Sequence, residues 1–168
     1  MRGHINCSDA DTGLASVFAA RKLSNDLFTL AIEAWLQVGL SRRFESDLQD
    51  DFWEGVFAFK ALYRRFPWSD RVETRLGFSA GLSYAGSVPF IEKDKAEEKD
   101  RRSSQLINYL EFSLDFCLGD VSEVDSLRDC FVGFYVHYRS GIFASANLYG
   151  NVYGGSNVNM LYVDWEFD

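Results

Sequence analysis

The residues best suited to chemistry lie near the C-terminus, where residues 130–141 read CFVGFYVHYRSG. Alternate side chains of an extended strand share one face, so Tyr138 and Ser140 continue an apolar face that begins at Cys130. The Ser140 hydroxyl is then expected at the rim of an apolar surface, where an enzyme that acts on lipid needs its nucleophile. Ser140 is therefore a candidate nucleophile.

The base for such a serine is less obvious, because a serine needs an adjacent base to react at neutral pH. His137 falls on the opposite, charged face of the strand, and Tyr138 is a poor base at its ordinary pKa of about 10. A β-bulge near Arg139 would turn His137 towards Ser140. Alternatively, His137 is an inward structural histidine paired with Asp115 or Asp129, and Ser140 is an ordinary strand-end residue.

Motifs for metal or cofactor chemistry are missing from the sequence. It contains no HExxH, CxxC or GxSxG pattern, and no lysine follows GGSN at residues 154–157 as a phosphate loop requires. We therefore expect no cofactor and no metal. The three cysteines are expected to be free thiols, since strand alternation places Cys117 and Cys130 on opposite sides of their strands.

Composition favours strands over helices. The chain has 168 residues, 16% of them aromatic, with 13 glycines and only 2 prolines. Its net charge of −8 argues against binding to nucleic acid, whose phosphates it would repel. No apolar run is long enough for a membrane-spanning helix, and residues 1–12 lack the apolar segment of a signal peptide. Taken alone, these absences favour a soluble cytosolic protein.

Hydrophobic alternation predicts seven strands. The clearest is residues 28–41, where LAIEAWLQ would also suit a helix by propensity alone but the apolar residues alternate throughout. The expected strands span residues 14–23, 28–41, 52–64, 71–84, 105–118, 130–141 and 157–167. Residues 14–168 are expected to form one β-barrel domain, preceded by an irregular segment of residues 1–13.

The length of the apolar faces favours a membrane barrel. They run for ten or more residues, whereas strands in soluble sheets average about five or six. Charges of both signs share the opposite face and suit a paired network inside a small barrel: Glu33, Lys60, Arg64, Glu73, Arg75, Glu111 and Asp115. The fold prediction is an all-β, antiparallel up-and-down transmembrane β-barrel of about eight strands. A soluble lipocalin-like carrier with its faces inverted is the alternative.

Connection lengths suggest an orientation. Residues 24–26, 66–70 and 119–126 form short connections, while residues 42–51, 85–104 and 142–156 form longer ones, as in bacterial outer-membrane barrels. Because such barrels have an even number of strands, we expect an eighth strand and a signal peptide upstream of Met1. The longest charged stretch, KDKAEEKDRR, is either a solvated mobile loop or a lid whose cations meet anionic head groups: Lys93, Lys95, Lys99, Arg101 and Arg102.

The C-terminal third resembles a known family. HYRSGIF at residues 137–143, the glycine-rich GNVYGGSN at residues 150–157 and the alternating last strand are similar to the end of the lipid A 3-O-deacylase (PagL-like) outer-membrane barrels. The segments YRRFPWSDRVETRLGFSAGLSYAGSVPFIE and INYLEFSLD resemble uncharacterised relatives of that group. The resemblance is architectural over residues 14–168 and motif-level over residues 137–157.

The resemblance implies an eight-stranded bacterial outer-membrane barrel whose partners are membrane lipid and lipopolysaccharide, and which hydrolyses an ester-linked acyl chain of lipid A. Its His-x-Ser pair and acidic residue map onto Tyr138, Ser140 and Asn157, so His137 is displaced by one position and an amide replaces the acid. On this reading the catalytic residues are Ser140, His137 and Asn157. The alternative is a non-catalytic barrel of the same fold that is structural or binds lipopolysaccharide.

Overall fold

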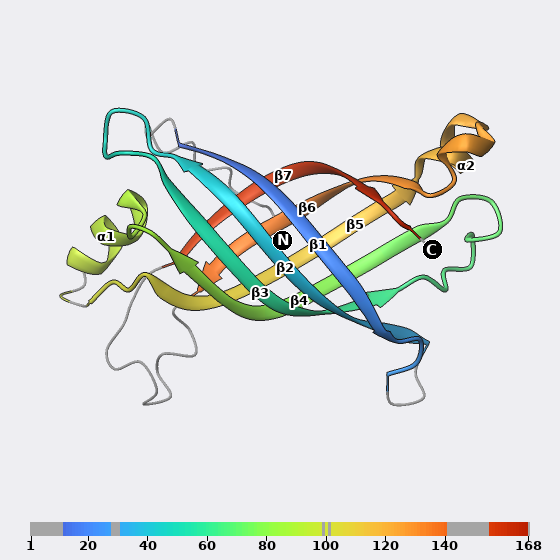
Figure 1. Cartoon of the computed structure of the whole chain (residues 1–168), viewed down its shortest axis with the longest axis horizontal. Helices are drawn as coiled ribbons and strands as arrows, with labels where there is room; N and C mark the ends of the chain where they lie inside the picture. Colours follow the sequence, from blue (N-terminus) through green and yellow to red (C-terminus); the bar gives the residue numbers. More distant parts are fainter. Residues whose placement is uncertain (1–11, 28–30, 99, 101, 141–154, 168) are drawn as a thin grey trace.

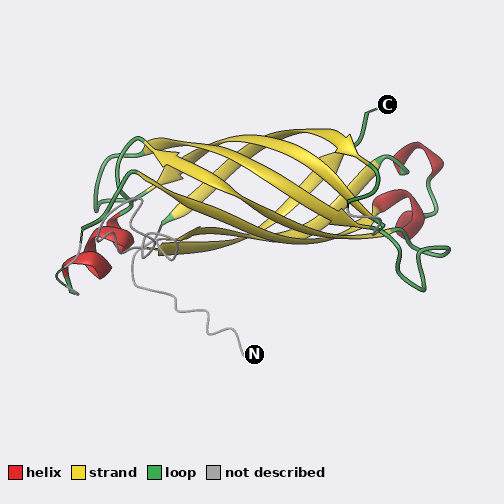
Figure 2. Ribbon diagram, turned by 90° about the horizontal axis from the view of Figure 1, so that it is seen from below, coloured by secondary structure: helices red, strands yellow, loops and turns green. Residues whose placement is uncertain are grey.

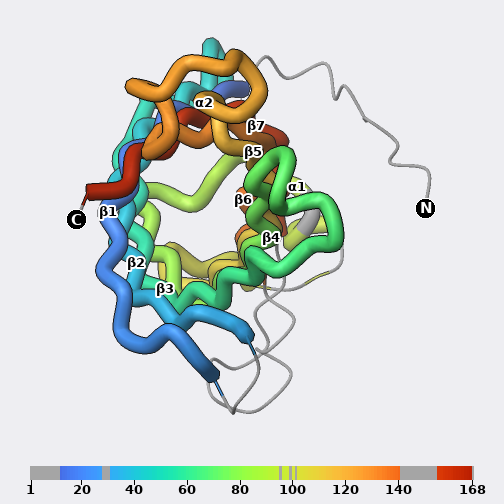
Figure 3. The backbone as a smooth tube through the Cα atoms, turned by 90° about the vertical axis from the view of Figure 1, so that its right-hand side faces the viewer, coloured from blue at the N-terminus to red at the C-terminus, as the bar shows by residue number. Residues whose placement is uncertain are grey.

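A computed structural model describes residues 12–27, 31–98, 100, 102–140 and 155–167. They form seven strands in one antiparallel sheet, in which each strand pairs with the next along the chain. The strands are β1 (Gly13–Ser24), β2 (Ile32–Phe44), β3 (Phe52–Tyr63), β4 (Thr74–Ala85), β5 (Leu106–Cys117), β6 (Cys130–Ser140) and β7 (Gly155–Trp165). The sheet curls into an open half-barrel (Figures 1 and 3).

The predicted strands are therefore confirmed, with small shifts at their ends. The strand expected at residues 28–41 is β2, which begins at Ile32 and extends to Phe44. Residues 28–30 and 1–11 lie outside the described residues. Seven strands are described where a barrel of about eight was expected, and among them β1 and β7 each pair along one edge only.

The two faces of the sheet have opposite character, as the alternation predicts. The outward face is mainly apolar, although Arg21 of β1 and Asn157 and Asn159 of β7 also lie on it. Its exposed large apolar side chains include Val17, Val38, Leu40, Phe57, Phe59, Leu76, Phe78, Phe112, Leu114, Phe134, Leu161 and Val163. The concave face buries charged and polar side chains instead, among them Arg43, Glu54, Arg75, Glu111, Asp115, His137 and Arg139. The interior of this sheet thus combines many buried polar groups with a small apolar cluster of Val56, Ala58 and Tyr109, against which Phe18 packs.

Two glycines allow close approach between neighbouring strands. A Cβ at Gly133 on β6 would lie 2.3 Å from the Cβ of Asp115 on β5, and one at Gly81 would lie 2.0 Å from the carbonyl oxygen of Phe57. Gly133 therefore leaves room for the buried Asp115 side chain beside it.

Short helices lie at the two ends of the strands (Figure 2). Helix α1 (Phe90–Glu97) occupies part of the segment expected to be a loop, so the prediction of a wholly irregular connection was wrong there. Helix α2 (Leu118–Ser122) and the 3-10 helix η1 (Asp125–Leu127) replace the expected turn at the opposite end. The connection of residues 118–129 is consequently longer than that of residues 45–51, contrary to the predicted alternation in length. None of the helices in the described ranges is long and apolar enough to cross a membrane.

Candidate functional site

The side chains most able to act chemically gather inside the half-barrel around Glu54 of β3. The Glu54 carboxylate accepts hydrogen bonds from Arg43 Nε and from Ser83 Oγ, the latter at 2.6 Å. His137 Nε2 of β6 lies 2.9 Å from Glu54 Oε1, and neither side chain has any exposed area. We call Arg43, Glu54, Ser83, His137 and Arg139 the lumenal cluster. It joins β2, β3, β4 and β6 across the interior.

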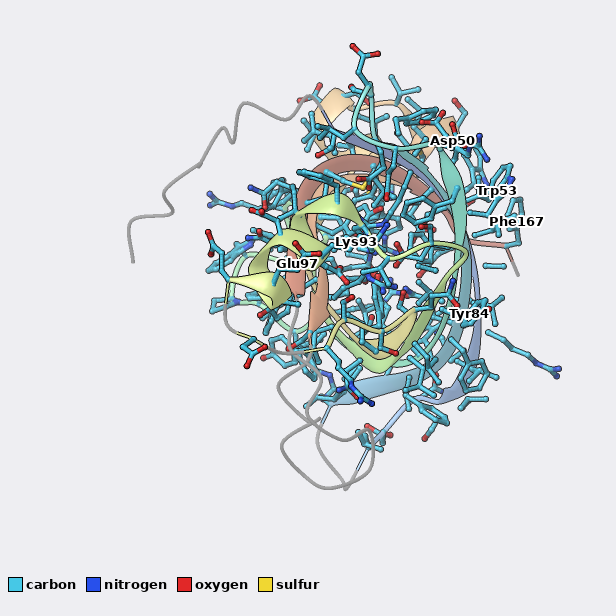
Figure 4. The ribbon with its side chains drawn as sticks, turned by 90° about the vertical axis from the view of Figure 1, so that its left-hand side faces the viewer. Asp50, Trp53, Tyr84, Lys93, Glu97 and Phe167 are labelled. Carbon is cyan, nitrogen blue, oxygen red and sulfur yellow. The ribbon has the colours of Figure 1, made fainter. Side chains whose placement is uncertain are left out.

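Arg139 connects this cluster to helix α1. Its Nε donates to Glu92 Oε1 at 2.9 Å, and Ser156 Oγ of β7 donates to the same oxygen at 2.6 Å. Glu92 is 1% exposed although it belongs to a highly charged segment. Figure 4, seen from this end, shows α1 lying across the end of the barrel with Lys93 and Glu97 on it. Helix α1 is therefore anchored through Glu92.

A second polar group lies further along the interior, around Glu111 of β5. Its carboxylate accepts hydrogen bonds from Tyr109 Oη at 2.7 Å and Gln37 Nε2 at 2.8 Å. Lys60 Nζ lies 3.2 Å from Glu111 Oε1. The buried Glu111 charge is therefore paired and hydrogen-bonded, as a carboxylate away from water requires.

The end nearest α2 holds the third group. Arg75 donates through Nε to Asp115 at 2.9 Å and through Nη2 to Asp164 at 2.7 Å, and its guanidinium lies 3.6 Å from the centre of the Phe131 ring. Together with Arg64–Glu33, Arg64–Glu73 and Lys60–Glu111, the Arg75–Asp115 pair confirms the predicted ion-pair network inside the sheet.

Arg64 follows β3 and serves several carboxylates at once. Its guanidinium bonds Glu73 Oε1 at 2.7 Å, Glu33 Oε2 at 3.2 Å and the carboxylate of Glu166. Burial lowers the pKa of Arg64, but the hydrogen bonds to Glu166 and Glu73 outweigh burial and raise the pKa above its ordinary value. The guanidinium therefore stays charged and fixes the β3–β4 connection to β2 and to the residues after β7.

The predicted catalytic residues do not converge. The pairing of β6 with β5 and β7 runs without a register shift from His137 to Ser140, so the proposed bulge near Arg139 is not there. Strand alternation consequently places His137 and Ser140 on opposite faces. Asn157 lies opposite Tyr138 and is exposed, on the face away from His137. The alternative prediction, that His137 is a structural histidine pointing inward, is confirmed. Its partner is Glu54, however, and not Asp115 or Asp129.

The lumenal cluster does contain a serine, a histidine and a carboxylate, but in the wrong order for a catalytic triad. A triad needs the imidazole between the hydroxyl and the acid, so that the imidazole can take the serine proton. Here the Glu54 carboxylate lies between Ser83 and His137 and touches both. All three residues are also fully buried, so this cluster offers no surface to a substrate.

Sequence reasoning missed Glu54 as the partner of His137, and at the α1 end it missed Glu92 and Ser156. Glu92 was hidden in a stretch where acids and bases are equally dense, and Ser156 falls in the glycine-rich segment. The contact between Glu92 and Ser156 cannot be predicted from a local pattern, because it forms only where α1 packs against β6 and β7. Of the predicted lid cations, Lys93 donates to Gln49 Oε1 at 2.7 Å. Lys99, Arg101 and the Lys95 side chain lie outside the described part of the chain.

Within the described ranges, no three His, Cys, Asp or Glu side chains gather so as to hold a metal ion. Comparison with known proteins found no match among family models, curated proteins or solved structures.

The outward surface carries aromatic side chains at both ends of the strands. Trp53 and Tyr84 lie at the α1 end and point away from the barrel (Figure 4), and Trp165 lies at the α2 end. The Arg42 guanidinium lies 5.3 Å from the centre of the Trp53 ring and 3.7 Å from Asp51. The outward face therefore carries exposed Trp and Tyr rings at its two ends, with exposed apolar side chains between them.

Proposed function

We propose that this chain is a bacterial outer-membrane β-barrel protein that contacts lipopolysaccharide through its outward surface without hydrolysing it. The observation that carries the proposal is the reversal of polarity: exposed apolar side chains cover most of the outside of the sheet, and paired charges are buried on its inside. The contiguous apolar patches of soluble monomers rarely exceed a few hundred Å². Lipid is a suitable solvent for a sheet whose outside is mainly apolar, which supports the proposed location in a membrane.

Strand length supports the same proposal. The strands have 11 to 13 residues, and a strand tilted by about 45° needs about 9–11 residues to cross a bilayer. Inside a sheet that crosses a bilayer, unpaired charges would be costly, and the interior charges here are paired and hydrogen-bonded. The lumenal cluster thus serves stability and shape, and the same contacts leave His137 without a role as a base.

Lipopolysaccharide is the proposed partner because of the α1 end. There Arg42 and Trp53 combine a cation with an exposed aromatic ring at the expected interface. Asp51 partly neutralises Arg42, so most of the contact would come from acyl chains against the apolar surface and less from phosphate on the guanidinium. Arg42→Ala should therefore weaken binding to lipopolysaccharide modestly and leave insertion into membranes intact.

The test is insertion into vesicles. Purified protein refolded from detergent should float with phospholipid vesicles containing lipopolysaccharide and should precipitate when detergent is removed without lipid. Protein that stays monodisperse in plain buffer would instead support the soluble lipocalin-like carrier. Arg128→Ala, at the exposed α2 end, is the matched control for Arg42→Ala because it removes the same charge far from the α1 end.

The second candidate is a lipid A deacylase-type ester hydrolase with Ser140 as nucleophile, His137 as base and Asn157 as orienting residue. It is favoured by the position of Ser140 and Asn157 on the same face of two paired strands. The contact of His137 with Glu54 opposes it. Released fatty acid, followed by mass spectrometry, decides between the two. Hydrolysis that is lost in Ser140→Ala and kept in Ser122→Ala, a change in α2, would replace the non-catalytic proposal.

A further inference from the structure

The two edges of the sheet form a seam, which we define by the sides of β1 and β7 that pair with no strand among the described residues. Two clefts open along it, of about 590 and 450 Å³. Both are lined by β1 and β7, and Phe18, Lys60 and Asp164 belong to both. The side chains at the seam are the most exposed apolar ones of their strands, with Val17 at 76%, Leu161 at 82% and Val163 at 69%.

We propose that the seam binds one extended, amphipathic β-strand of another polypeptide, which runs antiparallel to both β1 and β7. Along each edge about half of the backbone N–H and C=O groups point away from the existing neighbour. A strand satisfies these groups by a ladder on each side, whereas an acyl chain fills the clefts and leaves the groups unpaired.

The direction of the strands decides how the seam can close. Six successive antiparallel pairings make β1 and β7 run in the same direction. Direct pairing of β1 with β7 would therefore be parallel, as would pairing with the edges of a second copy inserted from the same side. One added strand in the opposite direction is antiparallel to both edges and gives an even number of strands.

The faces at the seam specify the chemistry of the strand. Its outward side chains would continue the apolar surface of Val17 and Val163. Its inward side chains must be small or polar, because Phe18 already packs edge-on to Tyr135 at 6.0 Å and Tyr135 meets Tyr162 at 5.4 Å. Lys60 and Asp164 in the clefts favour hydroxyl-bearing side chains there. The expected ligand alternates Leu or Val with Ser or Thr.

Disulfide trapping in detergent tests this inference. Val17→Cys on β1 and Val163→Cys on β7 each offer a thiol beside the seam, and Phe78→Cys on β4 offers one where both edges are paired. Cys7 is changed to serine in all three, and Cys117 and Cys130 are buried. The probe is a peptide of alternating Leu and Thr, as long as the 12-residue β1, with one central Cys among the outward residues.

We expect the peptide to form disulfides with Val17→Cys and Val163→Cys and not with Phe78→Cys. A peptide with proline at alternate positions, which cannot donate to a ladder, should give a yield about tenfold lower. In the wild-type chain, the amides of β1 and β7 should exchange about fivefold more slowly when the peptide is present.

Three results would overturn the proposal. Equal cross-linking at all three cysteines would show adhesion to the apolar surface, and disulfide-linked dimers of the chain without peptide would show that a second copy occupies the seam. Unchanged amide exchange with lipid retained at the seam would show an acyl chain there. Because the measurement is made in detergent, its outcome is independent of the vesicle flotation that tests the proposed function.

Discussion

Replacement of Glu54 by alanine would test whether the lumenal cluster stabilises the fold. The Glu54 side chain has no exposed area and contacts Arg43, Ser83 and His137. Its loss leaves the Arg43 guanidinium, only 5% exposed, without its carboxylate. Breaking a buried pair by removing one partner costs about 3–5 kcal/mol. Since a domain is stable by about 5–15 kcal/mol, Glu54→Ala should remove at least about a fifth of the free energy of unfolding.

Urea unfolding in detergent micelles measures this loss as a lower midpoint with an unchanged slope. Asp125→Ala is the matched control, because it removes a carboxylate that also pairs with an arginine but whose side chain is 92% exposed. The control should change stability by less than about 0.5 kcal/mol. Glu54→Gln should fall between the two, because its amide oxygen still accepts from Ser83. A Glu54→Ala protein within about 1 kcal/mol of wild type would refute the stabilising role argued from the structure.

Two further predictions concern the outward face and the close strand approach. Phe59→Arg should lower stability in vesicles by about 2–4 kcal/mol, measured by urea unfolding, whereas Leu48→Arg in the connection of residues 45–51 should not. An unaffected Phe59→Arg protein would contradict the membrane proposal. Gly133→Ala should lower the free energy of unfolding by about 1–3 kcal/mol, because the added Cβ would lie 2.3 Å from the Cβ of Asp115. Gly55→Ala should raise the free energy of unfolding by up to about 1 kcal/mol, because no atom lies within 4 Å of the added Cβ.

The strands and their faces could be predicted from the sequence because each depends on a local, period-two pattern. Phe57 and Phe59 alternate with Lys60, and that alternation alone fixes which side chains point inward. Helix α1 could not be found this way. It has no apolar stripe, and besides the small Ala96 it buries the charged Glu92, whose burial depends on Arg139 and Ser156 from distant strands.

Partners across the interior escaped prediction for the same reason. The direction of His137 follows from its place on β6, but its partner depends on how far the sheet curls and how the strands are staggered. Asp115 belongs to the strand paired with β6, yet it lies beside Gly133 and bonds Arg75. Glu54, three strands away from β6, reaches His137 across the curved interior.

That cross-interior contact also bears on catalysis. A histidine whose Nε2 is held by a buried carboxylate, on a strand of regular register, can reach Ser140 only if the pairing with β5 or β7 shifts by one residue. Such a shift would turn every following side chain of the strand to the opposite face, so Arg139 would leave Glu92 and the anchor of α1 would be lost. The contacts across the half-barrel therefore hold His137 away from the serine, which is why the non-catalytic proposal accounts better for the structure.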